Sequence, residues 1–419
     1  MERGELHPQY LDVKENSMMK REGGFTLIEL IITMAVFVLV MAAASGVFSG
    51  LLTQFKQQSR LAESNIEGVV GLEILRKDID AAGYGLPWNG VTGIITYTEA
   101  NGDPFSLNGS ADGVPKAIVS ADNVTYSGVN SIFTGSDYLV IRSIEVAGNA
   151  VSKKWTLVRS VAPYVRTWTP AGENLTSTDR VIVVTPGATT ASSHTLVTNG
   201  TAFSTTYANV TALPWRPSDP SEARVVYGID PTATLSMPFN RADYFIRRFD
   251  AGDADIAPKQ CAPNTGILEK AVISHVDGSY QFLPLLDCVA DMQVVYGFDD
   301  NNNGIIGTYT DGSTTVQSWP VGTPDESLTI ASVLAIFADP AALRQKLREV
   351  RVYILVHEGQ KDMNYTYPSS TIAVSSSSTS QPGYGLGRTY NLATLIGDPE
   401  YKHYRWKVYT VVGVPNSLR

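Results

Sequence analysis

The sequence predicts an α+β protein in which a long N-terminal α-helix precedes a large head rich in β-sheet. No charged residue occurs from Leu30 to Phe55, a run longer than the roughly 20 residues that a helix needs to cross a bilayer. After Gly83 the chain changes to short runs of β-branched and aromatic residues separated by Gly, Asn, Asp and Pro, which is typical of strands and turns. With 419 residues, the chain is long enough for an anchor and a large core.

The helix is expected over residues 25–83 and the head over residues 84–419. From Leu61 to Ala82 apolar residues recur at steps of three to five, close to the helical period. Gly83 is a natural C-cap. The predicted helix contains Gly46, Gly50, Gly68 and Gly71. Each glycine weakens the helix by roughly 1 kcal/mol relative to Ala. We interpret these positions as sites of close packing or local melting.

Lys20 and Arg21 precede the apolar run, so a cytoplasmic N-terminus is expected. A secretory signal peptide is one alternative, because the small residues 42–44 resemble a cleavage site, and an ordinary signal anchor is another. Glu29 argues against both, since the apolar part of a signal peptide is usually shorter and carries no acid. A membrane acid costs up to about 3 kcal/mol and needs a partner. Cleavage after Gly24 would provide one by freeing a cationic α-amine on Phe25.

The residues GGFTLIEL after a basic leader resemble the prepilin signature. This resemblance implies that Gly24 precedes the bond cut by prepilin peptidase, that Phe25 becomes the N-methylated terminus, and that Glu29 aligns incoming subunits. Residues 1–24 would then be the leader peptide. Because prepilin leaders are usually short, translation is expected to begin at Met18 or Met19.

Four segments of the chain resemble the PilW family of minor pilins: RKDIDAAGYG, DMQVVYGFDDNNNG, LREVRVYILV and YRWKVYTVVGVPN. Residues of about 100–225 lie outside this resemblance and are interpreted as an inserted lobe that could carry a separate binding surface. A helix is expected from Asp339 to about Leu347, with Asp at the cap and Pro in the first turn. Strands are expected at Gly93–Tyr97, Asp137–Ile144, Trp155–Val161, Arg180–Val184, Val225–Tyr227, Tyr244–Phe249, Met292–Phe298, Val350–Val356 and Tyr404–Val412.

The resemblance implies a pilin-like subunit that is incorporated into, or primes assembly of, a type IV pilus. A minor pseudopilin of a type II secretion system and a pilus-associated adhesin are the alternatives. The implied partners are prepilin peptidase, other minor and major pilins and the inner-membrane assembly platform. The expected location is the inner membrane, spanned once, and afterwards a periplasmic or extracellular filament.

Other function classes find little support in the sequence. The net charge is −9 without a basic block, which argues against nucleic-acid binding. No nucleophile elbow, phosphate loop or close metal spacing of the five histidines occurs, so the protein is not expected to be an enzyme. Asp78 and Asp80 are interpreted as part of a solvated helix face.

Two further sites are predicted in the head. Cys261 and Cys288 are expected to form a structural disulfide, with two buried free thiols as the alternative. A loop provides the first half of a D-x-[DN]-x-[DN]-G calcium motif, with a polar turn as the alternative. Its candidate ligands are Asp299, Asn301, Asn303 and the carbonyl of Ile305. Thr310 stands where the complete motif has a bidentate Glu, so only modest affinity is expected; no other cofactor is predicted.

Overall fold

The computed structural model describes residues 24–88, 95–101, 107–109, 113–124, 132, 135–187, 194–248, 258–312, 316–318, 328–376, 381–397 and 399–418. The predicted leader residues up to Gly23 therefore lie outside the described chain. Contacts divide the chain into two units, Met1–Gln58 and Ser59–Arg419. A long helix followed by antiparallel sheets confirms the α+β class.

Helix α1 extends over Leu27–Asp80. It begins two residues after the predicted start at residue 25 and ends three residues before the predicted end at residue 83. The side chain of Thr26 caps its start, since its Oγ1 accepts a hydrogen bond from the Glu29 N–H at 3.3 Å. Gly83 lies beyond the helix in the following turn, with φ +83°. Its N–H donates to the carbonyl of Arg142 at 2.9 Å, so Gly83 links the chain after α1 to a strand of the head.

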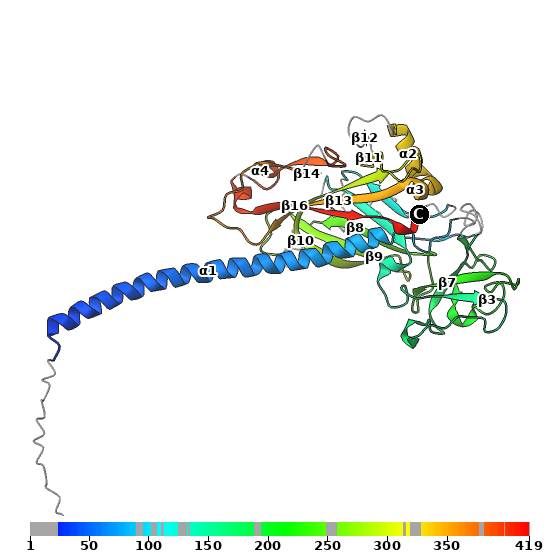
Figure 1. Cartoon of the computed structure of the whole chain (residues 1–419), viewed down its shortest axis with the longest axis horizontal. Coiled ribbons are helices and arrows are strands. Elements are labelled where there is room, and N and C mark those ends of the chain that lie inside the picture. Colours follow the sequence, from blue (N-terminus) through cyan, green and yellow to red (C-terminus); the bar gives the residue numbers. More distant parts are fainter. Residues whose placement is uncertain are drawn as a thin grey trace, which may run out of the picture. The chain divides into compact units, whose positions relative to one another are not determined.

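Within the described residues, the main sheet has nine strands, and their pairings are antiparallel. Its order is β1-β2-β8-β9-β10-β11-β12, with β13 paired to β10 and β16 paired to β13. The strands are β1 (Ile118–Ala121), β2 (Tyr138–Ser143), β8 (Asn240–Arg247), β9 (Gly266–Ile273), β10 (Tyr280–Phe298), β11 (Thr308–Thr310), β12 (Val316–Ser318), β13 (Leu347–Glu358) and β16 (Arg405–Gly413). Figure 1 shows the C-terminal part of α1 alongside the strands of this sheet.

The last turns of α1 belong to the main core. Leu72, Leu75 and Ile79 are buried in the same cluster as Val289 of β10. Gly71 allows the close approach, because a Cβ at this position would lie 2.1 Å from the carbonyl oxygen of Leu285. Of the two roles considered for the glycines, close packing therefore applies to Gly71.

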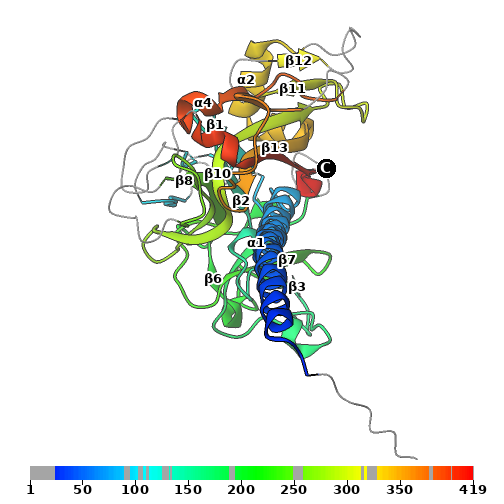
Figure 2. The same cartoon turned by 90° about the vertical axis from the view of Figure 1, so that its left-hand side faces the viewer.

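A second, five-stranded sheet lies within residues 155–230. Its order is β3-β7-β4-β5, with β6 also paired to β4, and Figures 1 and 2 show it on the opposite side of the head from β11 and β12. The strands are β3 (Trp155–Arg159), β4 (Arg180–Thr185), β5 (Thr195–Leu196), β6 (Thr205–Thr206) and β7 (Ala223–Asp230). One face has its own core around Val158, Val181 and Val226, whereas Ile182 and Tyr227 join the main core.

Short helices and a hairpin complete the head. Asp339 caps α3 as predicted, since its Oδ1 accepts from the Ala341 N–H at 2.8 Å. The elements are α2 (Ile330–Ala338), α3 (Pro340–Lys346), α4 (Leu392–Leu395), β14 (Thr371–Val374) and β15 (Arg388–Asn391), with 3-10 helices at Glu145–Ala147, Ala171–Glu173, Tyr207–Asn209, Glu400–His403 and Asn416–Leu418.

Eight predicted strands coincide with β2, β3, β4, β7, β8, β10, β13 and β16, although Phe249 lies outside the described residues. The prediction at Gly93–Tyr97 was wrong for its described part, residues 95–97, which contain no strand. Strand β9 and the first half of β10 were not predicted, because Glu269, Lys270 and Pro284 interrupt their apolar pattern. Within the range proposed as an insertion, β1 and β2 belong to the main sheet and only the later strands form the second sheet.

Candidate functional site

The predicted processing residues lie directly before the helix. Gly24 and Phe25 precede α1, and Phe25 is 80% exposed. Glu29 lies in the first turn, and its carboxylate is 3.5 Å from the Thr26 hydroxyl. Together with the Thr26 cap, this arrangement resembles a capping box, whose sequence signal is Thr-x-x-Glu. That signal was present at residues 26–29 and identifies where the helix begins.

The first part of α1 can span a membrane by length and composition. The segment Leu27–Lys56 contains an 18-residue window with a mean hydropathy of 2.6, and none of that window is buried within the described chain. Exposed apolar surface of this extent is unfavourable in water, at about 25 cal/mol per Å². It therefore needs lipid or other apolar helices around it.

At the other end of α1, Asp78 and Asp80 connect the helix to the head. Asp78 is buried and contacts the ammonium group of Lys270 and the hydroxyl of Tyr244. Burial raises the pKa of Asp78, although Lys270 counteracts this effect. Asp80 accepts a hydrogen bond from the Val414 N–H at 2.7 Å. The interpretation as a solvated face was wrong for Asp78, which is buried against side chains of strands far away in the sequence. Asp80 is half-buried and also pairs with Arg76 on the same helix, at 2.7 Å.

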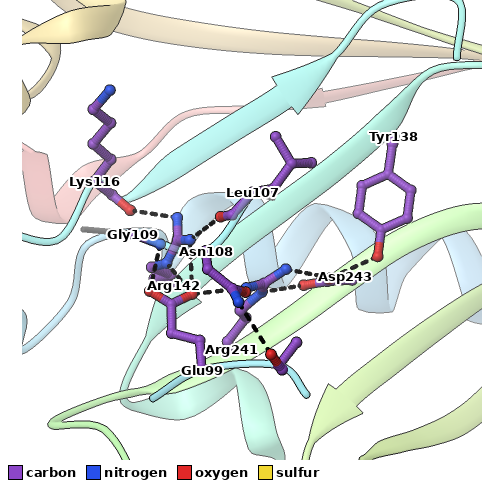
Figure 3. Close-up of polar contacts among 10 residues, drawn as sticks. Glu99, Leu107, Asn108, Gly109, Lys116, Tyr138, Arg142, Arg241 and Asp243 are labelled. Carbon is purple, nitrogen blue, oxygen red and sulfur yellow. Dashed lines mark hydrogen bonds and ion pairs between the residues drawn. The ribbon is translucent and has the colours of Figure 1, made fainter. Parts of the chain in front are cut away.

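A buried polar cluster lies between β2, β8 and residues 99–109. Figure 3 shows Glu99 between two guanidinium groups. One oxygen, Oε2, accepts from Arg142 Nη2 and from Arg241 Nη1, each at 2.8 Å. Arg241 also binds Asp243 through two parallel hydrogen bonds of 2.7 Å, and Tyr138 donates to the same carboxylate at 2.6 Å.

The charges in this cluster balance, with two guanidinium groups facing two carboxylates. Burial alone would raise the pKa of Glu99, but the neighbouring charges of Arg142 and Arg241 outweigh it and lower the pKa. The Tyr138 pKa is raised by burial and by the Asp243 carboxylate. Because the cluster has no solvent-facing member among these residues, its arrangement is suited to holding strands together rather than to proton transfer.

Cys261 and Cys288 form a disulfide with an S–S distance of 2.02 Å. His357 is the third member of a compact group with these sulfurs, but disulfide sulfurs are not thiolate ligands. His357 is buried, its Nε2 accepts from the Ala262 N–H at 2.8 Å, and burial lowers its pKa to about 3. These residues therefore form a structural crosslink with a neutral imidazole beside it.

The loop after β10 brings the candidate calcium ligands together only as a turn. The two carboxylate oxygens of Asp299 accept from the N–H groups of Asn303 and Gly304, at 3.1 and 3.0 Å. Arg348 Nε lies 3.3 Å from the same carboxylate. The Asn301 and Asn303 side chains bind N–H groups two residues further on, that of Asn303 binding the N–H of Ile305. A guanidinium at this distance repels a divalent cation, so the residues do not fit a calcium site.

Comparison with protein-family models gives two matches. Residues 19–45 match the prokaryotic N-terminal methylation motif, and residues 243–416 match Type IV Pilus-assembly protein W. No curated protein and no solved structure matches the chain significantly. The second match begins in β8 and continues through β16, so the second sheet lies outside it.

Proposed function

We propose that this chain, a PilW-like pilin with a prepilin methylation motif, is a minor subunit that is incorporated into type IV pili or primes their assembly. The observation that carries the proposal is the position of Glu29. Glu29 is an acid in the first turn of an exposed and largely apolar span. It lies four positions after Phe25 in the sequence. Cleavage between Gly24 and Phe25 by prepilin peptidase would create the counter-charge that a membrane acid requires.

The pairing of the Glu29 carboxylate with the new amine on Phe25 suggests an order for membrane insertion, processing and assembly. Before assembly the span crosses the inner membrane, with the N-terminal side in the cytoplasm because Lys20 and Arg21 precede it. Processing leaves an N-methylated amine on Phe25, which remains cationic near neutral pH. This amine meets the Glu29 carboxylate of a neighbouring subunit as apolar spans of minor and major pilins pack together at the assembly platform.

In this proposal the head has a structural and binding role, not a catalytic one. The contacts of Asp78 and Asp80 attach the head to the second part of α1. The cluster of ionisable groups around Glu99 and Arg241 is buried and internally paired. Such a cluster is not accessible to a substrate.

Substitutions at Glu29 test the proposal. Glu29→Gln removes the charge with little change in shape, and we expect normal membrane insertion but reduced incorporation into pili. Glu29→Asp keeps the charge and should retain more incorporation, while Ser45→Ala on the same span is the control. The intact mass of the wild-type chain should correspond to N-methyl-Phe25 as the first residue. Wild-type incorporation of Glu29→Gln, or a mature chain that begins near Ser45, would refute the proposal.

The alternative role in a type II secretion pseudopilus uses the same anchor. The PilW match favours the pilus. Genes for pilus tip and minor pilin proteins beside this gene would agree with that assignment, whereas secretin-linked pseudopilin genes would favour the secretion system.

A further inference from the structure

Two tryptophans, the exposed Trp155 and the half-buried Trp168, form a corner at the edge of the second sheet. Trp155 in β3 is 38% exposed. Its ring centroid lies 4.8 Å from that of Trp168, and the ring planes meet at 64°. The Trp168 indole N–H donates to the carbonyl oxygen of Trp155 at 2.6 Å. Exposed indole surface is costly in water, and clusters of such rings commonly mark binding sites.

The corner is held in place by the backbone. Residues 164–168 extend along the edge of β3 that does not pair with β7, where the Arg166 N–H donates to the Leu157 carbonyl at 3.0 Å. Asn174 fixes Trp168 from both sides: its Oδ1 accepts from the Trp168 N–H at 2.7 Å, and its Nδ2 donates to the Trp168 carbonyl at 2.9 Å. A surface that is ordered before binding loses less entropy when a ligand binds.

Polar groups surround the corner and leave one ring open. The Arg166 guanidinium lies 4.0 Å from the centroid of Trp168 and is stacked on that ring. Beside Trp155 is a cavity of about 220 Å³ lined by Lys153, Lys154, Trp155, Trp168, Thr169 and Glu173. Lys154 already donates to the carbonyl of Asn174 at 3.0 Å, whereas the Lys153 and Glu173 side chains are exposed at the rim.

We propose that this cavity binds a sugar ring of a polysaccharide, with the ring packed against Trp155. A pyranose has an apolar face of C–H groups that suits an aromatic ring, and hydroxyl groups that both donate and accept. Glu173 accepts from such hydroxyls and Lys153 donates to them. The volume is below the roughly 300–1,000 Å³ typical of drug-sized ligands, which suits one ring of a longer chain.

A single-stranded nucleic acid fits this surface less well. Successive bases stack on open aromatic faces along a basic groove, but here Arg166 covers Trp168 and the Glu173 carboxylate repels phosphate groups. The sugar site lies outside the residues that match the pilus-assembly family. Its function does not depend on pilus incorporation, so the two proposals can fail separately.

Binding to the detergent-solubilised full-length chain tests the inference. The probes are hexasaccharides of cellulose, chitin, galactan and polygalacturonate, with a dT oligonucleotide as the competing ligand class, and the readout is tryptophan fluorescence supported by calorimetry. We expect at least one hexasaccharide to bind. Comparing the neutral and carboxylated probes identifies the class of sugar.

For that hexasaccharide, Trp155→Ala should weaken binding by roughly tenfold or more, while Trp155→Tyr should retain much of it. Lys153→Ala and Glu173→Gln should each weaken binding by a smaller factor. The matched control is Tyr384→Ala, which removes an aromatic ring that is 40% exposed elsewhere on the head; its affinity should equal that of the wild type. Absence of saccharide binding, binding of dT alone, or equal affinity for Trp155→Ala and the wild type would overturn the proposal.

Discussion

Arg142 and Arg241 are directly opposite each other on the neighbouring strands β2 and β8, and both donate to the same oxygen of Glu99. Like charges in opposed positions of a sheet destabilise it when they stand alone. Here the carboxylate between the two guanidinium groups compensates their repulsion. The pairing of β2 with β8 therefore depends on a residue that belongs to neither strand.

Removing this shared charge should destabilise the head. Glu99→Gln leaves two buried guanidinium groups facing each other, and we expect a loss of about 3–5 kcal/mol in the free energy of unfolding, measured by urea unfolding of the full-length chain. Glu400→Gln breaks the exposed pair with Lys361 and should have a much smaller effect, because exposed ion pairs contribute little to stability. Equal effects of the two variants would contradict the role assigned to Glu99.

Two glycines of α1 should respond differently to the same change. In Gly71→Ala the new Cβ meets the Leu285 carbonyl oxygen at 2.1 Å, so the helix must move away from β10, and we expect destabilisation of about 1–3 kcal/mol. Nothing lies within 4 Å of the corresponding position at Gly50. Gly50→Ala should leave the unfolding of the head unchanged, and equal unfolding curves for both variants would argue against the close contact at Gly71.

The disulfide should contribute to the stability of the head but not to processing. Cys261 and Cys288 are separated by 27 positions, and removal of such a crosslink costs roughly 3.5 kcal/mol in the chain-entropy model. We expect Cys261→Ala to lower the melting temperature while the mature mass of the N-terminal peptide stays the same. Two free thiols in a non-reduced peptide map of the wild type would refute the prediction.

The head should lose stability in weak acid because of His275. Burial lowers the pKa of His275 to about 4, and its neutral ring accepts from the Ser236 N–H and lies 3.0 Å from Asn240 Oδ1. Between pH 6.5 and 4 the unfolded chain binds a proton that the folded chain does not. His275 should therefore lower the free energy of unfolding by up to about 3 kcal/mol as the pH decreases through this window, in addition to the contribution of the buried His357.

The variant His275→Gln separates this contribution from the others. This substitution should reduce the slope of the free energy of unfolding against pH by the amount that corresponds to about one bound proton. His403→Gln, at a half-buried position, is the matched control. An unchanged slope in His275→Gln would show that other groups cause the loss of stability in acid.

Calcium should have no effect on the turn at Asp299, since Arg348 already neutralises this carboxylate. We expect the same melting temperature in millimolar calcium and in chelator. Asp299→Ala should lower it in both conditions, because the variant loses the hydrogen bonds from Asn303 and Gly304. A calcium-dependent rise that Asp299→Ala abolishes would instead establish the calcium loop.

Local patterns in the sequence were sufficient to predict some of the elements of this protein. The apolar span and the residues Gly24, Phe25 and Glu29 are adjacent in the chain, so their combination is visible without a fold. The strands β13 and β16 were predicted because their runs are long and alternate in polarity. In these cases the composition and spacing of apolar residues within one short segment indicate which structure it forms. Such a segment can therefore be interpreted without knowledge of the rest of the fold.

Only the tertiary structure determined which polar residues become buried partners. Glu99 meets Arg241 across 142 positions, and Asp78 becomes buried because Lys270 and Tyr244 lie on strands β9 and β8 that pack against α1. Likewise, Trp155 and Trp168 form a corner because residues 164–168 return along the edge of β3. A charged residue has the same local sequence pattern whether it faces water or a distant counter-charge. Its burial is decided by strand pairing, which brings remote segments together and compensates the cost of desolvation.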